Sequence, residues 1–342
     1  MTDRKGIRDE IEKIDLTLRE LLKHRTELVR KAYLQGMMDL PNDEETADAY
    51  RKSTLEFGLD LKITDDVCIS VSRGAAEIPG KTSSHRHIAV IGGNGNMGKW
   101  LERFFRTSGH TVDIIDPSAD NGFILKDAAN ADTVVVSVPI SAVDGILRKL
   151  DGICNADTLI FDITSLKTPF IDTLKNMAKT KKICSVHPMF GPSAVSMSGR
   201  NILVCDCGDC RAVKEACDLM GVGGGNVNVI DAERHDVYMS YVLGLSHAIN
   251  IAFFTVLERS GISLRDMKSV ASTTYNKMMD TNRSVALENP DLYYEIQHLN
   301  GNRDKMLEEF EKSVRDVMEA ASDDNPDRFR ELMDRGRRYF TE

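Results

Sequence analysis

The sequence predicts an α/β protein in which a doubly wound parallel sheet follows a small all-α segment and precedes an all-α domain. Short apolar runs alternate with helix-length segments from His87 to about residue 206, which is the pattern of βαβ units. A glycine-rich turn follows the first apolar run, and from about Ala232 long periodic segments replace the strands. We therefore expect three domains, at residues 1–80, 86–231 and 232–342.

The N-terminal part has the periodicity of helices. Apolar residues between positions 4 and 35 recur mostly at spacings of three and four with charges between them, which predicts one amphipathic helix ending near Gly36. Two shorter helices are expected at about 43–57 and 64–77, followed by a linker at 79–84 that is rich in turn-forming and polar residues.

The central part predicts strands and the C-terminal part predicts helices. The expected strands begin at His87 and continue at residues 111–116, 133–140, 158–164, 182–187 and 201–206. The expected C-terminal helices lie at residues 233–259, 264–282, 291–322 and 326–340. We expect this helical tail to complete an active site and to supply a dimer interface.

Composition excludes some classes of function. The chain has 342 residues and a net charge of −9, which argues against nucleic acid as a partner because phosphate binding needs a broad basic surface. We find no apolar run of membrane-spanning length and no secretory signal at the N-terminus, so we expect a cytoplasmic protein with no membrane partner. The seven cysteines are then expected to be reduced thiols.

One group of cysteines has a spacing that could suggest metal binding. Cys205, Cys207 and Cys210 are crowded at the end of one expected strand, and Cys217 follows in an expected helix. Structural zinc sites usually use two separated pairs of ligands, so we expect incidental thiols here and no metal.

A dinucleotide-binding motif directly follows the first expected strand. Gly93, Gly95 and Gly98 form a GxGxxG turn, with Asn96 and Met97 at the start of the next helix. In a Rossmann-type domain the first glycine allows the tight turn, the second lets the backbone approach the pyrophosphate and the third allows close helix–strand packing. The phosphates then bind the free N–H groups of the helix N-terminus.

Two further features belong to the same predicted site. Asp116 ends the second strand, 18 residues past Gly98, where a carboxylate accepts hydrogen bonds from ribose hydroxyls and repels a 2′-phosphate. The cofactor is therefore expected to be NAD rather than NADP, unless Asp116 only ends the strand in a turn. Ser137 and Pro139 end a later strand at the same carboxyl edge, where cofactors lie in such sheets.

The predicted chemical centre is His187, at the carboxyl end of the fifth strand. An imidazole there could accept a proton from a substrate hydroxyl while hydride leaves the same carbon, or it could merely cap the strand. The surrounding sequence HPMFGP resembles the signature of prephenate dehydrogenases, as do the DITSLK stretch at 162–167 and the ENPDLY stretch at 288–293. These matches cover residues 87 to about 300 in the family's order.

The resemblance implies roles for particular residues. His187 matches the histidine that bonds to the ring hydroxyl of prephenate, and Ser165 matches the serine that orients both groups. His247 matches a substrate-side histidine, although it could also be a satisfied histidine on a helix face. Arg283 is the candidate for clamping a substrate carboxylate, but it lies seven residues before Pro290 instead of the family's six, which a local bulge could absorb. Lys167 is the reserve candidate.

The N-terminal helix resembles a second family. Arg8 and Arg25 lie 17 residues apart, as do arginines that bind substrate carboxylates in the first helix of all-helical chorismate mutases. The rest of the sequence departs from the pattern of that family. The lysine expected 11 residues after the second arginine is Gly36, and the start of the expected second helix lacks the family's arginine. We expect the fold and dimeric packing to be retained. Mutase activity on chorismate stays open beside a structural or dimerising role.

The resemblance implies NAD-dependent oxidative decarboxylation of prephenate to 4-hydroxyphenylpyruvate in tyrosine biosynthesis, by a homodimer that needs no metal. Three alternatives stay open. The first is a β-hydroxyacid dehydrogenase of the same architecture, which would use a lysine and would not need HPMFGP. The second is an arogenate dehydrogenase, and the third is an inactive sensor that binds NAD and aromatic metabolites. A sensor would have no need of both Ser165 and His187.

Overall fold

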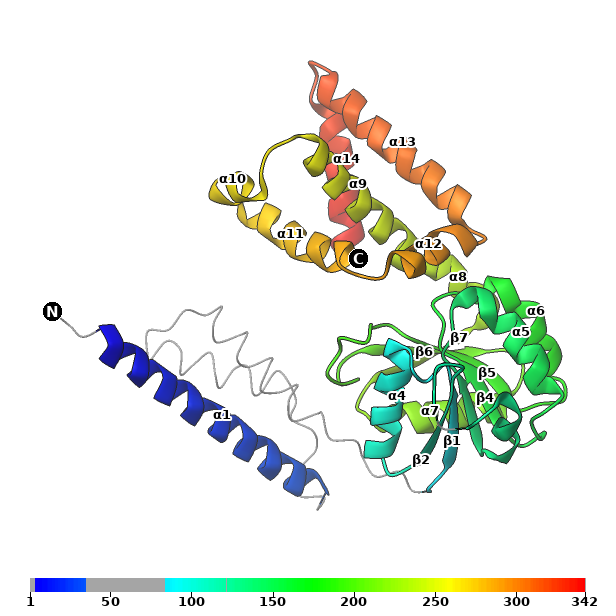
Figure 1. The fold of residues 1–342 in the computed structure, drawn as a ribbon. Helices are drawn as coiled ribbons and strands as arrows, with labels where there is room; N and C mark the ends of the chain where they lie inside the picture. The colour runs from blue at the N-terminus through cyan, green and yellow to red at the C-terminus, as the bar shows by residue number, and fades with distance from the viewer. Residues whose placement is uncertain (1–3, 35–83, 121, 342) are drawn as a thin grey trace. The chain divides into compact units, whose positions relative to one another are not determined.

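The computed structural model describes residues 4–34, 84–120 and 122–341. They form an N-terminal helix, a seven-stranded sheet flanked by helices, and a helical C-terminal region (Figure 1). This confirms the predicted fold class. Helix α1 (Arg4–Leu34) confirms the predicted N-terminal helix. The shorter helices expected at 43–57 and 64–77 and the linker lie outside the described residues.

The sheet has the strand order β2-β1-β3-β4-β5-β6-β7. The strands are β1 (His87–Ile91), β2 (Thr111–Ile115), β3 (Thr133–Val136), β4 (Leu159–Asp162), β5 (Ile183–Pro188), β6 (Asn201–Asp206) and β7 (Asn226–Asp231). Strands β1 to β5 pair in parallel, so their carboxyl ends meet at one edge, whereas β6 runs antiparallel to β5. The predicted doubly wound parallel sheet thus includes one antiparallel pair, between β5 and β6, as mixed sheets of this class commonly do.

Strand β7 was not expected from the sequence. Four of its six residues are exposed and two are half-buried, so it has none of the continuous buried run that marks the central strands. It lies at the edge of the sheet, where only one neighbour is available for pairing.

The helices around the sheet follow the strands in turn. They are η1 (Leu125–Asn130), α4 (Asn96–Thr107), α5 (Ile140–Asp151), η2 (Thr168–Phe170), α6 (Ile171–Met177) and α7 (Cys210–Gly221). Trp100 and Phe104 of α4 and Ala212 and Leu219 of α7 share one buried cluster with apolar residues of the strands, so both helices cover the same face of the sheet (Figure 1). This packing holds the carboxyl edge of the strands in place.

The C-terminal region is entirely helical within the described residues. Its helices are α8 (Ala232–Met239), η3 (Ser240–Leu245), α9 (Ser246–Arg259), α10 (Leu264–Ser269), α11 (Thr273–Ala286), α12 (Pro290–Leu299), α13 (Arg303–Ser322) and α14 (Asp327–Thr341). Two predicted helices are each divided in two. Ser272 caps the start of α11 by accepting from the backbone of Tyr275, and Asn300 lies between α12 and α13.

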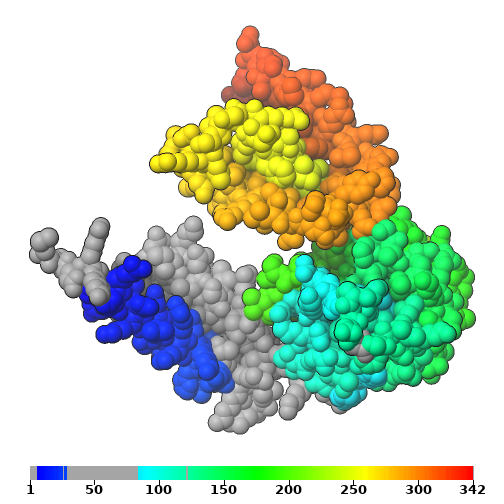
Figure 2. Space-filling view, in the orientation of Figure 1, coloured from blue at the N-terminus to red at the C-terminus, as the bar shows by residue number. Residues whose placement is uncertain are grey.

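The run from α8 to α9 corrects one expectation. Residues Ala232–Arg259 are long and apolar enough to cross a membrane by length and composition alone, so the prediction that no apolar run reaches that length was wrong. Charged residues cluster at its ends, which leaves a long uncharged centre. Only 17% of the most apolar window is buried, and Tyr241, Val242 and Val256 are exposed there. In Figure 2, the chain from residue 232 onward is coloured from yellow-green to red, and Ala232–Arg259 is the first part of it.

Contacts between residues divide the chain into two compact units. The first comprises Met1–Ser137, Leu150–Ile163 and Ala178–Val229, and the second comprises Val138–Lys149, Thr164–Met177 and Ile230–Glu342. The predicted domain at residues 86–231 included α5 and α6. In the structure, most of α5 and all of α6 group with the C-terminal helices instead. The chain passes from the first unit to the second after β3, after β4 and within β7, and it returns to the first near the end of α5 and after α6.

Candidate active site

The turn after β1 has the geometry of a phosphate-binding loop. Gly92 adopts a φ of +78°, which side chains other than glycine rarely tolerate. A Cβ on Gly93 would lie 2.6 Å from the side chain of Ile114, and a Cβ on Gly98 would lie 2.5 Å from the carbonyl oxygen of Gly92. The tight turn thus depends on Gly92 rather than on Gly93, while Gly93 and Gly98 allow close packing.

Helix α4 begins directly after this turn with its first donors uncapped. Gly95 occupies the N-cap position in an extended conformation, and no side chain accepts from the first turn. A Cβ on Gly95 would meet only the Gly92 carbonyl oxygen, at 3.2 Å. The backbone N–H groups around Asn96 and Met97 are therefore available to an anion, and their contact with the cofactor stays a prediction.

Asp116 directly follows β2 and bonds to the same turn. Its carboxylate accepts hydrogen bonds from the backbone N–H of Asn94 at 3.1 Å and from the backbone and hydroxyl of Ser118 at 2.9 and 2.6 Å. Hydrogen bonds from Ser118 are the main reason why the pKa of Asp116 is lowered, although burial opposes them. The group is thus a fixed negative charge beside the phosphate-binding turn, which suits ribose hydroxyls and disfavours an added phosphate.

The other residues expected to face the cofactor or substrate follow neighbouring strands. Ser137 comes just after β3, and its N–H bonds to the Ile91 carbonyl at the end of β1 at 2.8 Å. His187 lies in the last part of β5 and is 4% exposed. Asp162 at the end of β4 pairs with Ser185, and Ser165 follows three residues later and is half-buried. Because β3, β4 and β5 are parallel, the residues at their carboxyl ends lie at the same edge of the sheet.

Lys167, the reserve candidate for binding a substrate carboxylate, is buried. Its side chain is fully inaccessible, and its Nζ donates to the carbonyl oxygen of Thr164 at 2.8 Å. The backbone N–H groups of Lys167 and Thr168 both donate to the carboxylate of Asp236, which also accepts from Nδ1 of His235 at 2.6 Å. This burial disfavours Lys167 as a substrate-binding cation. The hydrogen bonds of its backbone and side chain instead stabilise the turn that follows Ser165.

His247 is an unsatisfied histidine in the second unit. It is 9% exposed, its ring stacks on Tyr293 with a centroid distance of 4.1 Å, and its Nδ1 has no partner within the described residues. Burial lowers its pKa to about 4, so the ring is neutral near pH 7. The alternative of a satisfied helix-face histidine is therefore not supported. Asn282, on neighbouring α11, is 2% exposed and its Oδ1 also lacks a partner in the described chain.

The predicted arginines are exposed or half-buried. Arg283 is exposed and lies in the last turn of α11. Helix α11 continues past Arg283 to Ala286, and residues 287–289 connect it to Pro290 at the start of α12. Arg8 is exposed and Arg25 half-buried on α1. The roles of these three residues stay predictions.

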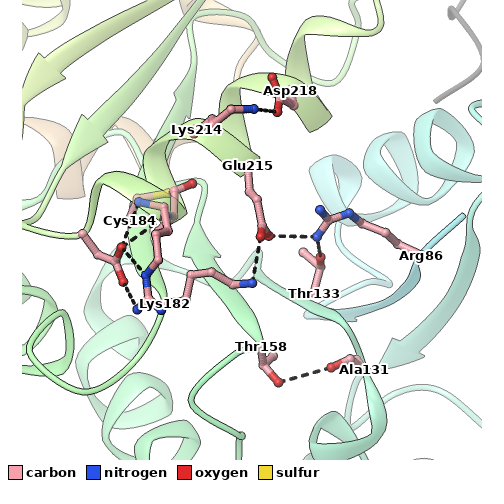
Figure 3. A network of polar contacts seen from close by, with 12 residues as sticks. Arg86, Ala131, Thr133, Thr158, Lys182, Cys184, Lys214, Glu215 and Asp218 are labelled. Atoms are coloured by element: carbon pink, nitrogen blue, oxygen red, sulfur yellow. Dashed lines mark hydrogen bonds and ion pairs between the residues drawn. The ribbon is translucent and has the colours of Figure 1, made fainter. Parts of the chain in front are cut away.

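A polar cavity of about 790 Å³ lies at the opposite, amino edge of the sheet. Figure 3 shows that its charged residues bind one another: Glu215 accepts from Arg86 at 3.0 Å and from Lys182 at 2.8 Å. Because both cations already share one carboxylate, this cavity has no free cation for an anionic substrate among these residues. Its network instead ties α7 to the sheet.

Among the described residues, no group of three or more His, Cys, Asp or Glu side chains is arranged to hold a metal ion, and this includes the predicted cysteine cluster. Cys205 and Cys207 are buried, Cys210 is exposed and Cys217 is half-buried, and the six cysteines of the described residues are free thiols. Burial raises the pKa of Cys154 to about 11 and that of Cys184 well above its usual value, so neither is a thiolate at neutral pH.

Comparison with protein families decides between the architectures that share this sheet. A model described as "Prephenate dehydrogenase, nucleotide-binding domain" matches residues 101–206, and one described as "Prephenate dehydrogenase, dimerization domain" matches residues 231–335. The chain belongs to the prephenate dehydrogenase family. This excludes the β-hydroxyacid dehydrogenases as its family. The resemblance seen in the HPMFGP and DITSLK segments is thereby confirmed.

Individual relatives of this family are distant. The T-protein of Enterobacter agglomerans is 25% identical over 307 residues, which cover 85% of this chain and 80% of that protein. Prephenate dehydrogenase from A. aeolicus, solved with hydroxyphenyl propionate and NAD+, has a TM-score of 0.58 and 20% identity, over 76% of this chain and 100% of that one. Synechocystis arogenate dehydrogenase has a TM-score of 0.59 and 18% identity, over 75% and 100%. The two solved structures show that the fold is shared.

Sequence reasoning missed several residues of the site. Asp236 and Glu295 both accept from backbone N–H groups more than 60 residues away in the chain, and no local pattern marks such contacts. Asn282 directly precedes Arg283, but only the helix orientation shows that it is the buried neighbour. Gly92 could have been found, because two consecutive glycines end the first strand.

Proposed function

We propose that the protein catalyses the NAD-dependent oxidative decarboxylation of prephenate to 4-hydroxyphenylpyruvate in tyrosine biosynthesis. The observation that carries this proposal is the phosphate-binding turn, with its uncapped helix and the ionised Asp116, in a chain of the prephenate dehydrogenase family. His187 lies at the carboxyl edge of the same sheet and supplies the group that the chemistry needs.

The residues of the turn fit NAD. The donors at the start of α4 suit the pyrophosphate, and the carboxylate of Asp116 suits the hydroxyls of the adenosine ribose. A 2′-phosphate would meet that carboxylate as a like charge, which favours NAD over NADP. Ser137 and Pro139 follow β3 at the same edge and are proposed to contact the cofactor. When bound, NAD accepts the hydride.

The residues of the chain handle the proton and the orientation of the substrate. As hydride leaves the hydroxyl-bearing ring carbon, His187 takes the hydroxyl proton, and Ser165 orients that hydroxyl and the imidazole. The new carbonyl draws the electron pair of the C–CO2 bond into the ring. CO2 departs, the ring becomes aromatic and its oxygen regains a proton. Once the substrate is oriented in this way, the reaction needs no covalent bond between substrate and protein.

His247 and Arg283 are proposed to bind the rest of the substrate. A neutral imidazole with a free Nδ1 can bond to a carboxylate or carbonyl oxygen without carrying charge. Arogenate, which has an amino group where prephenate has a keto group, is the alternative substrate. Because the fold is shared with Synechocystis arogenate dehydrogenase, arogenate is included in the substrate panel described below.

We further propose a soluble cytoplasmic homodimer that forms through the helical region. The region matched by the dimerization-domain model contains a groove lined by Tyr241, Leu245, Ile249, Phe310 and Val314, which leaves apolar surface open to solvent in one chain. Light scattering after size exclusion should give twice the mass of 38.1 kDa.

The N-terminal segment is proposed to be a chorismate mutase-like helical domain. Arg8 and Arg25 lie on one continuous helix, and the match to the T-protein covers more of the chain than residues 86–342 alone could supply. Gly36 and residues 43–47 lack the cations that would hold a charged transition state. Its turnover of chorismate is decided by the experiment below.

The experiment that tests the function is a substrate panel with purified full-length protein. Chorismate, prephenate and arogenate are each incubated with NAD and with NADP, and reduced-cofactor absorbance and products are followed. We expect NADH and 4-hydroxyphenylpyruvate from prephenate. Faster turnover of arogenate would assign the alternative substrate, and NAD binding without any turnover would support a sensor.

A further inference from the structure

Helix α5 begins directly after the turn that carries Ser137 and Pro139, and its first donors are taken by a distant carboxylate. Glu295 of α12 accepts from the backbone N–H of Ile140 at 3.0 Å, from that of Ser141 at 3.3 Å and from the Ser141 hydroxyl at 2.6 Å. A carboxylate at this position also interacts favourably with the positive end of the helix dipole. The start of α5 is therefore fixed by a residue 154 positions later than Ser141 in the chain.

The two helices that follow β1 and β3 differ in this respect. No side chain caps the first turn of α4, which leaves its donors for the phosphates of a nucleotide. The corresponding donors of α5 are occupied by Glu295. The first N–H groups of α4 are therefore available to a ligand, whereas those of α5 already bind the carboxylate of Glu295.

Glu295 is itself held in place by its neighbours on α12 and by Asn300 directly after that helix. Ile296 is 3% exposed, Gln297 donates from Nε2 to the carbonyl oxygen of Gly244 at 2.8 Å, and Asn300 donates to the carbonyl oxygen of Asp236 at 3.1 Å. A carboxylate carried on a helix fixed on both sides is ordered before any ligand binds, so little entropy opposes its capping role.

We propose that Glu295 is a positioning residue for the cofactor turn at residues 137–141. This inference rests on the proposed function, because it takes Ser137 and Pro139 to contact NAD. Glu295 touches neither cofactor nor reacting atoms. It fixes the backbone of Ile140 and Ser141, and thereby the turn before them. Loss of the carboxylate frees the turn, which should weaken NAD binding more than it slows the chemical step.

The test compares Glu295→Ala and Glu295→Gln with a control on the same helix. Asp144 of α5 bonds to Arg148 at 2.7 Å and to Thr173 at 2.6 Å, so Asp144→Ala also removes hydrogen bonds of α5 but leaves its start intact. Trp100, the single tryptophan of the chain, lies in α4 and reports NAD binding by its fluorescence in the absence of substrate. Thermal unfolding of each variant records general loss of stability.

We expect Glu295→Ala to weaken NAD binding on the order of tenfold and to raise the KM for NAD similarly, while kcat changes less than about threefold. Glu295→Gln keeps one acceptor oxygen and should recover part of the affinity, and Asp144→Ala should bind NAD like the wild type. The amides of Ile140 and Ser141 should also exchange hydrogen faster in Glu295→Ala.

The outcomes separate the inference from the proposed function. Unchanged NAD affinity in Glu295→Ala, or an equal loss in Asp144→Ala, would overturn the positioning role while leaving the function intact. If the wild type binds NAD but does not oxidise prephenate, the function fails and the positioning role is still decided by the fluorescence titration. A wild type that does not bind NAD would refute both.

Discussion

Asp236 is expected to be the most sensitive buried carboxylate of the second unit. It is 2% exposed and accepts from four donors, namely the backbone N–H groups of Lys167 and Thr168, the hydroxyl of Thr168 and Nδ1 of His235. Asp236→Asn keeps the shape but replaces one acceptor oxygen with a donor, so at least one buried donor loses its partner.

The expected loss of stability follows from that geometry. Each unsatisfied buried donor costs about 1–3 kcal/mol, and breaking a buried charged pair costs about 3–5 kcal/mol, so we expect about 4 kcal/mol for Asp236→Asn. For a domain of about 150 residues, this corresponds to a melting temperature lowered by roughly 8–16 °C. Glu311→Gln, which removes an exposed pair with Arg315, should cost only about 0.3–0.5 kcal/mol.

The assay is equilibrium unfolding in urea followed by circular dichroism, repeated across pH. Burial alone would raise the pKa of Asp236, but hydrogen bonds from His235 and Thr168 lower it overall. The carboxylate therefore stabilises the fold fully above pH 4 to 5, and its contribution is lost as pH falls through the lowered pKa. The gap between wild type and Asp236→Asn should shrink below pH 4. A loss under 1 kcal/mol at pH 7, or one equal to that of Glu311→Gln, would refute the reasoning.

Other predictions test the two halves of the site. His187→Asn should leave NAD affinity nearly unchanged while turnover falls by about two to four orders of magnitude, measured by steady-state kinetics; unchanged turnover would remove His187 from the mechanism. Gly98→Ala should destabilise the sheet domain, because the new Cβ would lie 2.5 Å from a backbone oxygen, whereas Gly95→Ala, at 3.2 Å, should destabilise it less; equal losses in thermal unfolding would contradict this packing. His247 should titrate near pH 4 in NMR spectra, so that its burial destabilises the fold as pH falls from 6.5 towards 4, where the unfolded chain gains the proton first; a midpoint near 6.5 would contradict its burial.

The fold was largely predictable because its signals are local. The run of apolar residues at each central strand, and the glycines directly after the first, specify buried parallel strands and a phosphate-binding turn within a few residues. Strand β7 escaped prediction because most residues of this edge strand are exposed, so it has no buried apolar run. The antiparallel pairing of β6 depends on which neighbour it meets, which local periodicity does not record.

The site was predictable only in part. Asp116 and His187 stand at strand ends, where topology alone brings them to one edge of the sheet. The burial of Lys167, the capping carboxylates of Asp236 and Glu295, and the exposure of Arg283 depend on contacts between distant segments or on the rotation of a helix. The sequence contains these residues but not the contacts that decide their roles.

The most direct measurement uses prephenate that carries deuterium on the hydroxyl-bearing ring carbon. If that carbon gives up hydride as CO2 leaves, the deuterium must appear on the nicotinamide ring of the reduced cofactor, with one CO2 and one 4-hydroxyphenylpyruvate formed for each NADH. Deuterium retained in the aromatic product, or NADH formed without CO2, would contradict the reaction assigned to this protein.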